Sequence, residues 1–246
     1  MAINMERGLL GAAVLAIGIV LGGFLAGNGL ARARSADRFV TVKGISEREV
    51  KADLVIWPLQ IVAADDDLGR AHAQIQASVR RILTFLAAQQ IDTSQAELQD
   101  FSVSDAQVNQ YSGGTQAGSR YVIRQTVVVR SQSPDRVLSA SQRVGELVSA
   151  GVVLSSGGEY GSGGPTFIFT KLNELKPPMI AEATARAREA AEQFARDSRS
   201  VLGGIRRANQ GVFEILPRDQ APGISEGSQI VKTVRVVSTV EHFLKD

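Results

Sequence analysis

The feature that most constrains this chain is an uninterrupted apolar segment near its N-terminus, residues 9–27. The segment holds no charged residue and no proline. A helix of about 20 apolar residues is about 30 Å long, which is enough to cross the hydrocarbon core of a bilayer. Backbone N–H and C=O groups in lipid need partners within their own segment, so a spanning segment has to be helical. The sequence therefore predicts one N-terminal transmembrane helix, within a membrane anchor of residues 1–31.

A cleaved signal peptide is the main alternative, because Ala31, Arg32 and Ala33 form an A-x-A cleavage pattern. The apolar run is longer than the roughly 7–15 residues of a signal-peptide core, which favours a retained anchor. A buried core helix is disfavoured, since the segment is apolar on every face and lies at a terminus. The orientation stays open. The arginines that follow the segment place the C-terminal side in the cytoplasm by the positive-inside count, whereas the short leader is typical of a secretory signal.

The apolar segment also carries small residues at a spacing typical of close helix packing. Gly18 and Gly22 are four residues apart, as are Gly23 and Gly27, and Gly22 is paired in the same way with Ala26. Small residues at this spacing let two helix backbones approach closely in a membrane. We expect these five residues to form helix-packing surfaces within the membrane.

The composition limits the chemistry of the remaining chain. Lys and Arg number 27 and Asp and Glu number 25, which gives a net charge of +2. This balance gives no argument for nucleic acid as a partner. The chain has no cysteine, which excludes disulfides, thiol catalysis and cysteine metal sites. We expect neither a cofactor nor a bound metal.

The hydrophobic periodicity predicts an α+β fold after a linker of residues 32–38. The order strand, helix, strand, polar tip and strand occurs in residues 53–130 and again in residues 166–243, and a helix near residues 133–151 joins the two copies. Two such βαββ units predict a mixed, largely antiparallel sheet with helices on one face. The expected strands are residues 39–45, 53–63, 98–108, 121–130, 166–170, 205–216 and 230–243, and the expected helices are residues 65–90, 133–151 and 178–202.

Some residues carry local structural expectations. Trp57, the only tryptophan, is expected in the core. Pro58 has no N–H to donate, so it indicates an edge strand or a bulge. Residues 46–51 are charged and are expected to form a turn, and residues 203–204 are expected to end the helix before them. Residues 111–119 and 217–227 are expected to form two polar tips.

The chemical candidates are few and scattered. Asp65, Asp66 and Asp67 open a predicted helix, where acids cap free N–H groups and complement the helix dipole. His72 is expected close to the buried stripe that Leu68 and other apolar residues form on this helix, and His242 is expected to be exposed. Glycine-rich residues 157–164 match neither a phosphate-binding loop nor a serine nucleophile elbow.

The soluble part resembles the SIMPL domain family of bacterial envelope proteins, over about residues 38–245. The family pattern is followed in order and spacing along the chain, and this chain departs from it mildly at Ala52–Asp53 and at residues 44–46. The residues that carry the resemblance are residues 40–44, 51–54, 90–93, 101–103, Tyr121, residues 183–190, Ala195 and residues 202–204.

The resemblance implies an exported or envelope location, and some members are similar to ring-like or cage-like homo-oligomers with a loose link to stress tolerance. The family carries no accepted catalytic motif, so it supplies no functional residues. We therefore expect a non-enzymatic SIMPL-like domain, residues 39–246, that is anchored in the inner membrane, faces the periplasm and forms a homo-oligomer larger than a dimer.

Two other functions stay open from the sequence. The first is a monomeric adaptor that binds another envelope protein. The second is an unrecognised hydrolase, whose candidates are Ser162, His72, His242 and the acids at residues 65–67. No nucleophile and base are recognisable as a pair among them, so the sequence favours a protein that is not an enzyme.

Overall fold

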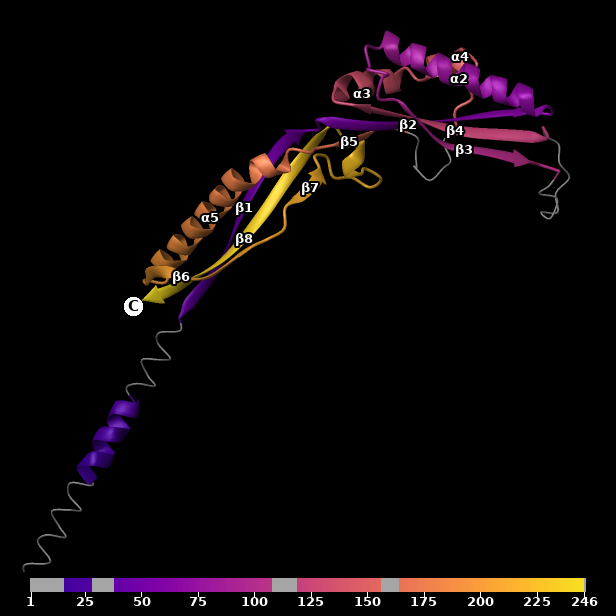
Figure 1. The fold of residues 1–246 in the computed structure, drawn as a ribbon. Helices are drawn as coiled ribbons and strands as arrows, with labels where there is room; N and C mark the ends of the chain where they lie inside the picture. The colour runs from indigo at the N-terminus through magenta and orange to yellow at the C-terminus, as the bar shows by residue number, and fades with distance from the viewer. Residues whose placement is uncertain (1–15, 28–37, 108–118, 156–163, 246) are drawn as a thin grey trace, which may run out of the picture. The chain divides into compact units, whose positions relative to one another are not determined.

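The computed structural model describes residues 16–27, 38–107, 119–155 and 164–245 (Figure 1). The chain divides into two compact units. Unit 1 comprises Met1–Ser46, Pro177–Phe213 and Val236–Asp246, and unit 2 comprises Glu47–Lys176 and Glu214–Arg235. Strands β1 (Phe39–Lys51) and β8 (Val231–Lys245) contribute residues to both units.

Unit 1 is a sheet covered on one face by helix α5 (Leu172–Asp197). The strand order is β1-β8-β6, and β6 (Val201–Gln210) runs antiparallel to β8. The face of α5 that packs on the sheet consists of Ala183, Ala187, Ala191 and Ala195, which are all buried. These small side chains let the helix approach the strands closely. A Cβ on Gly44 of β1 would lie 1.8 Å from the carbonyl oxygen of Ala183.

Unit 2 holds the larger core. Its sheet has the order β3-β4-β2-β5, with β2 (Leu54–Asp65), β3 (Glu97–Asp105), β4 (Tyr121–Ser131) and β5 (Thr166–Ile168) paired antiparallel. Helices α2 (Leu68–Ala88), α3 (Pro134–Gln142) and α4 (Gly145–Ser149) lie on one face of this sheet (Figure 1). Alternate residues of β2 and β4 point into that core, and they include Val55, Trp57, Ile61, Ile123 and Val127.

A short strand and a loop complete unit 2. Strand β7 (Glu214–Pro217) pairs with β8, and the loop that follows contains the 3₁₀ helix η1 (Glu226–Ser228). Lys232 of β8 is fully buried, and its ammonium group contacts both the carboxylate and the backbone carbonyl of Glu226. The expected polar tip at residues 217–227 is therefore folded back and held by the ion pair of a buried lysine with a partly exposed glutamate. The other expected tip lies almost wholly in residues 108–118, outside the described residues.

The predicted α+β class with antiparallel strands is confirmed, but the prediction of one sheet is wrong. The described residues form two four-stranded sheets. The second βαββ copy is divided between them, because β5 pairs with β2 at Leu54–Ile56 whereas β6, β7 and β8 belong to the sheet of β1. Strand β1 also continues through residues 47–51, which the sequence predicted as a turn.

Several element boundaries differ from the sequence prediction for local reasons. Helix α5 begins at Leu172 and includes Pro177 and Pro178, although the prolines predicted a start at residue 178. The helix ends at Asp197, and Gly203–Gly204 lie inside β6. The helix expected at residues 133–151 is two helices, and the strand expected at residues 205–216 is divided between β6 and β7.

Two expectations for β2 are settled by its pairing. Trp57 is buried, as predicted. Pro58 lies opposite Val128 of β4, in a strand that the sheet order places between β4 and β5. On the other side of β2, however, β5 pairs only with Leu54–Ile56 and the next described partner is Leu154, opposite Ile61. Pro58 therefore lies where this side has no strand partner among the described residues, and a missing N–H is tolerated there.

Residues 16–27 form a helix whose side chains are exposed. No atom lies within 4 Å of a Cβ built on Gly18, Gly22, Gly23 or Gly27. Residues 9–15 of the expected span lie outside the described residues. Within the described ranges, no helix is both long enough and apolar enough to cross a membrane.

The close approach at Gly44 gives a test of the packing in unit 1. We predict that Gly44→Ala lowers the free energy of unfolding by about 1–3 kcal/mol or more, because the added methyl group overlaps the backbone of α5. Gly204→Ala is the matched control, since nothing lies within 4 Å of a Cβ there. Urea unfolding followed by circular dichroism measures both, and equal stability of the two variants would contradict the packing described here.

Candidate functional site

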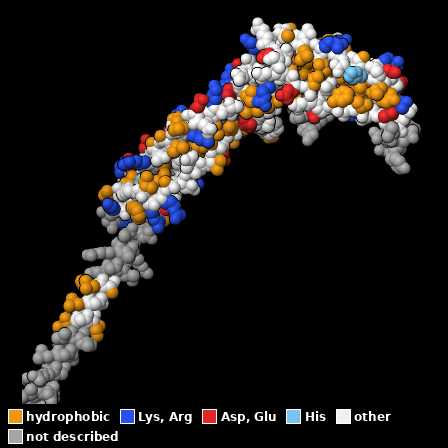
Figure 2. All heavy atoms as spheres, in the orientation of Figure 1, with side chains coloured by type: hydrophobic (Ala, Val, Ile, Leu, Met, Phe, Trp, Pro, Cys, Tyr) orange, Lys and Arg blue, Asp and Glu red, His pale blue; other side chains and the backbone are white. Residues whose placement is uncertain are grey.

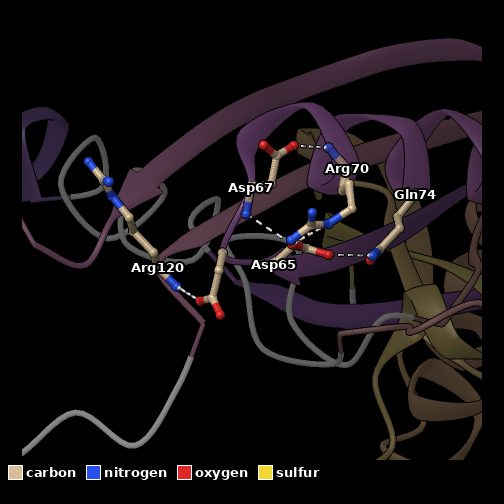
Figure 3. A network of polar contacts seen from close by, with 6 residues as sticks. Asp65, Asp67, Arg70, Gln74 and Arg120 are labelled. Atoms are coloured by element: carbon tan, nitrogen blue, oxygen red, sulfur yellow. Dashed lines mark hydrogen bonds and ion pairs between the residues drawn. The ribbon is translucent and has the colours of Figure 1, made fainter.

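The three acidic residues before α2 all accept hydrogen bonds, and those of Asp65 and Asp67 are local (Figure 3). Asp67 caps the helix, because its Oδ1 accepts the N–H of Arg70 at 2.8 Å. Asp65 Oδ1 accepts the N–H of Asp67 at 2.9 Å and Nε of Arg70 at 3.0 Å, and its Oδ2 accepts Nε2 of Gln74 at 3.2 Å. The acids therefore fix the first turns of the helix, as the capping prediction expected.

The same network joins the start of α2 to two strand ends. Asp66 Oδ1 accepts the N–H of Arg120 at 3.0 Å. The guanidinium of Arg120 pairs with Asp105 at 3.2 Å and lies 4.7 Å from the ring centre of Tyr121. Asp105 ends β3 and Tyr121 begins β4, so these contacts hold together the two strand ends on either side of residues 108–118.

The charges of this network stabilise the ionised carboxylates. The hydrogen bond from the Arg70 side chain is the main reason that the pKa of Asp65 is below its usual value. The Arg120 side chain lowers the pKa of Asp105 in the same way. Within the described ranges, no group of three or more His, Asp and Glu residues is placed to hold a metal ion. The arrangement is that of a structural clamp.

Residues matched to the family pattern at the β1–β2 turn also have structural contacts. Asp53 accepts the N–H of Thr170 at 2.7 Å and its hydroxyl at 2.6 Å. Burial raises the pKa of Asp53, but the hydrogen bonds from Thr170 outweigh it and the net change is downward. Lys51 pairs with Asp135 at 2.7 Å. These contacts tie the turn to β5 and α3 within unit 2.

The hydrolase candidates do not form a catalytic arrangement in the described part of the chain. His72 is exposed on α2 and packs edge-to-face against Phe101, with 6.4 Å between the ring centres. His242 is 5% exposed, so its predicted exposure is wrong. It lies on the side of β8 that alternates into the core, and its Nδ1 is 3.4 Å from the carbonyl oxygen of Gly203. Ser162 lies outside the described residues.

A hollow between α2 and α4 is a feature that the sequence did not predict. It has a volume of about 630 Å³, and Phe85 and Leu147 form its most buried lining. Its rim carries the arginines Arg80, Arg81 and Arg143. A signal was present in the sequence, since no acid stands three or four residues from Arg80 or Arg81 on the helix.

Apolar side chains are exposed at the edge of each sheet, and Figure 2 shows hydrophobic atoms on the surface of both units. In unit 1, Val201 and Ile205 of β6 are 61% and 56% exposed, and Phe194 of α5 is 58% exposed. In unit 2, Phe101 and Val103 of edge strand β3 are about half exposed. Exposed apolar residues that gather at strand edges are typical of association surfaces.

The fold and these surfaces define an α+β protein with two antiparallel sheets, unpaired strand edges and no catalytic constellation among the described residues. Its family is shown by comparison. The model of the SIMPL family, a protein of unknown function (DUF541), matches residues 40–240. The match covers most of the 246 residues, so the chain belongs to the SIMPL family. No curated protein matches the chain.

The hydrogen bonds between Asp65 and Arg70 predict a dependence of stability on pH. The folded pKa of Asp65 is lowered, so its contribution to stability is present above the unfolded pKa and is lost as the pH falls through the folded value. We predict that Asp65→Asn lowers the melting temperature at neutral pH and reduces its fall at acidic pH.

Thermal melts from pH 7 to about pH 2 measure this effect. Arg70→Gln and the double variant complete a mutant cycle. Because Asp65 and Arg70 share one interaction, the double variant should lose less than the sum of the single losses. Additive losses would show that the pair does not contribute as described.

Proposed function

We propose that this SIMPL-family protein is a non-enzymatic, membrane-anchored component of a bacterial envelope that self-assembles into a homo-oligomer larger than a dimer. The observation that carries the proposal is the outer edge of β6. Strand β6 ends the order β1-β8-β6, and no described strand pairs with its outer side. Such an edge presents unpaired N–H and C=O groups that bind a strand of another chain.

The side chains around β6 favour association over solvation. Val201, Ile205 and Phe194 are each more than half exposed, which places three large apolar groups on the strand and the helix beside it. Covering these groups with another copy would remove apolar surface from water. The same contact would satisfy the backbone groups of the strand edge.

Other features of β6 oppose unlimited strand addition. The pairing of β6 with β8 shifts register between Leu202 and Ile205 and again between Ile205 and Arg207. Arg206 lies 4.0 Å from the ring centre of Phe39 and pairs with Glu241. Bulges and charges of this kind limit edge-to-edge aggregation. They favour a specific contact in a closed assembly.

The second apolar edge supports an assembly larger than a dimer. Strand β3 of unit 2 exposes Leu98, Phe101 and Val103 at the end of its own sheet. A chain with two dissimilar edges offers heterologous contacts, which form rings when the rotation closes. A monomeric adaptor would use the same edges for another protein, so the mass of the assembly separates the two functions.

The proposal that the protein is not an enzyme is supported by the contacts of the histidines. His72 contacts Phe101, and His242 contacts a backbone carbonyl. Neither imidazole has a hydroxyl partner among the described residues. A periplasmic location and a link to stress tolerance remain proposals that come from the family resemblance.

The apolar segment, residues 9–27, gives a test of anchoring and location. We predict that the full chain stays in the membrane fraction after carbonate extraction, and that a chain starting at Arg34 is released. A reporter that is active only in the cytoplasm, fused after Asp246, should give no signal. A mature native chain that starts near Arg34 would overturn the anchor, and a strong reporter signal would overturn the periplasmic location.

Assembly is tested on the full chain in a mild uncharged detergent. We predict that light scattering gives a protein mass greater than that of two 26.2 kDa chains. The double variant Val201→Glu/Ile205→Glu should reduce this mass to that of a smaller species, because it places charges on the β6 edge. Gly18→Leu/Gly22→Leu should weaken the assembly less, since we propose that the apolar helix only supports it.

Val148→Glu is the matched control for the β6 variant. Val148 is 58% exposed on α4 of unit 2, so the change places one glutamate, where the β6 variant places two, on an apolar surface elsewhere. It should leave the mass unchanged. A monodisperse monomer of the wild-type full chain would overturn self-assembly and favour the adaptor.

A further inference from the structure

The hollow between α2 and α4 combines an apolar floor with a basic rim. Phe85 of α2 and Leu147 of α4 are 9% and 2% exposed and form the floor. Ala77, Ala88 and Ala150 line the hollow between the helices, and their small side chains leave it open. Its volume of about 630 Å³ lies within the roughly 300–1,000 Å³ that is usual for small-molecule sites.

The charges on the rim are unequal. Arg143 is the one arginine with partners, because its Nε lies 2.8 Å from Glu146 and its Nη1 donates to Oε1 of Gln89 at 3.0 Å. This pair neutralises Glu146, the only acid in the lining. Within the described part of the chain, the guanidinium groups of Arg80 and Arg81 have no hydrogen bond and no ion pair. Two uncompensated positive charges therefore lie beside the apolar floor.

Arg81 lies across the end of α4. Its Nη1 is 3.8 Å from the position of a Cβ on Gly151, the residue with φ of +80° that follows this helix. Arg81 also lines a second hollow of about 570 Å³, which Val62, Ala64 and Val153 border. Arg81 thus borders both hollows. An anionic group can bind Arg81 while the apolar part of the same ligand is covered by one of the hollows.

We propose that this hollow binds a small amphipathic organic anion. The apolar body of the ligand lies against Phe85 and Leu147, and its carboxylate or sulfonate accepts hydrogen bonds from Arg80 and Arg81. Guanidinium groups bind the oxygens of such anions through paired, charge-assisted hydrogen bonds. The site is separate from the β6 edge, so it does not depend on the proposed self-assembly.

Both parts of the ligand are required by the arrangement. A bare inorganic anion would leave the apolar floor uncovered. Its only contacts would be with exposed arginines, where it would have to displace water. A neutral apolar molecule would leave the two guanidinium charges without a partner. The expected selectivity is therefore for an anion with an attached aryl or alkyl group.

Isothermal titration of the full chain tests this site, with an uncharged detergent at one fixed concentration in every arm. The probe is 4-phenylbutyrate, compared with its neutral analogue 4-phenylbutanol and with inorganic sulfate. We expect 4-phenylbutyrate to bind with higher affinity than either of the others. Arg80→Gln/Arg81→Gln should weaken that binding by about tenfold or more, as expected for the loss of hydrogen bonds to a charged group.

Two further variants make the result specific. Arg124→Gln/Arg130→Gln removes two exposed arginines of β4. They lie on the face of the unit 2 sheet that is opposite to α2 and α4, so the affinity should be unchanged. Ala88→Phe fills the hollow without changing its charge and should abolish binding, while an unchanged thermal melt shows that the variant is folded.

The proposal is overturned if 4-phenylbutyrate does not bind the wild-type chain, or if 4-phenylbutanol or sulfate binds as tightly. It is also overturned if the control pair loses as much affinity as Arg80→Gln/Arg81→Gln, or if folded Ala88→Phe keeps its affinity. A protein that is monomeric but binds the probe would reject self-assembly and leave this site standing.

Discussion

The close packing of α5 on its sheet is the constraint on which unit 1 depends. With a single helix over three strands, this unit has little else to build a core from, and its buried cluster consists of Val42, Ala187, Ala191 and Val240. Small side chains contribute little apolar area each. Packing is therefore achieved by proximity, with backbone almost in contact with backbone at Gly44. This is why a glycine on β1 and a row of alanines on α5 occur together in the sequence.

Unit 2 builds its core from large side chains, in contrast to the small side chains of unit 1. Large side chains such as Trp57, Ile82 and Phe167 fill the space between its sheet and helices. The Asp65–Arg70 and Arg120–Asp105 pairs hold element ends at the margins of this unit. The larger core leaves room for surface features that are not needed for packing, including the arginine-rimmed hollow and the apolar edge of β3.

Local features of the sequence predicted the elements better than their arrangement. The helical periodicity of residues 68–88 was visible because α2 buries one face, and the largely apolar sequences of β2 and β4 predicted strands. The division into two sheets was not predicted, since pairing depends on contacts distant in sequence, such as Leu54 with Ile168. The prolines of α5 misplaced its predicted start, because proline is typical of a first helical turn whereas Pro177 and Pro178 are the sixth and seventh residues of this helix.

The candidate sites show the same limit. The cap by Asp67 follows from its place before a helix, whereas the hollow of Arg80 and Arg143 requires two helices to be brought together. His242 was predicted to be exposed, as a residue that alternates outward beside Glu241. The strand instead turns every second residue inward from Lys232 to His242, whatever its polarity. Burial of a polar residue is decided by register, which a single strand does not reveal.

The ion pair of buried Lys232 with Glu226 has a consequence for how this family can vary in length. The ammonium group is fully covered and is met by a carboxylate only six positions earlier in the chain. An insertion between these residues would separate the pair and leave a buried charge alone, which is costly. An insertion between residues 219 and 224 would keep the spacing intact. Relatives should therefore differ in length before η1 and keep a constant distance between η1 and the last strand.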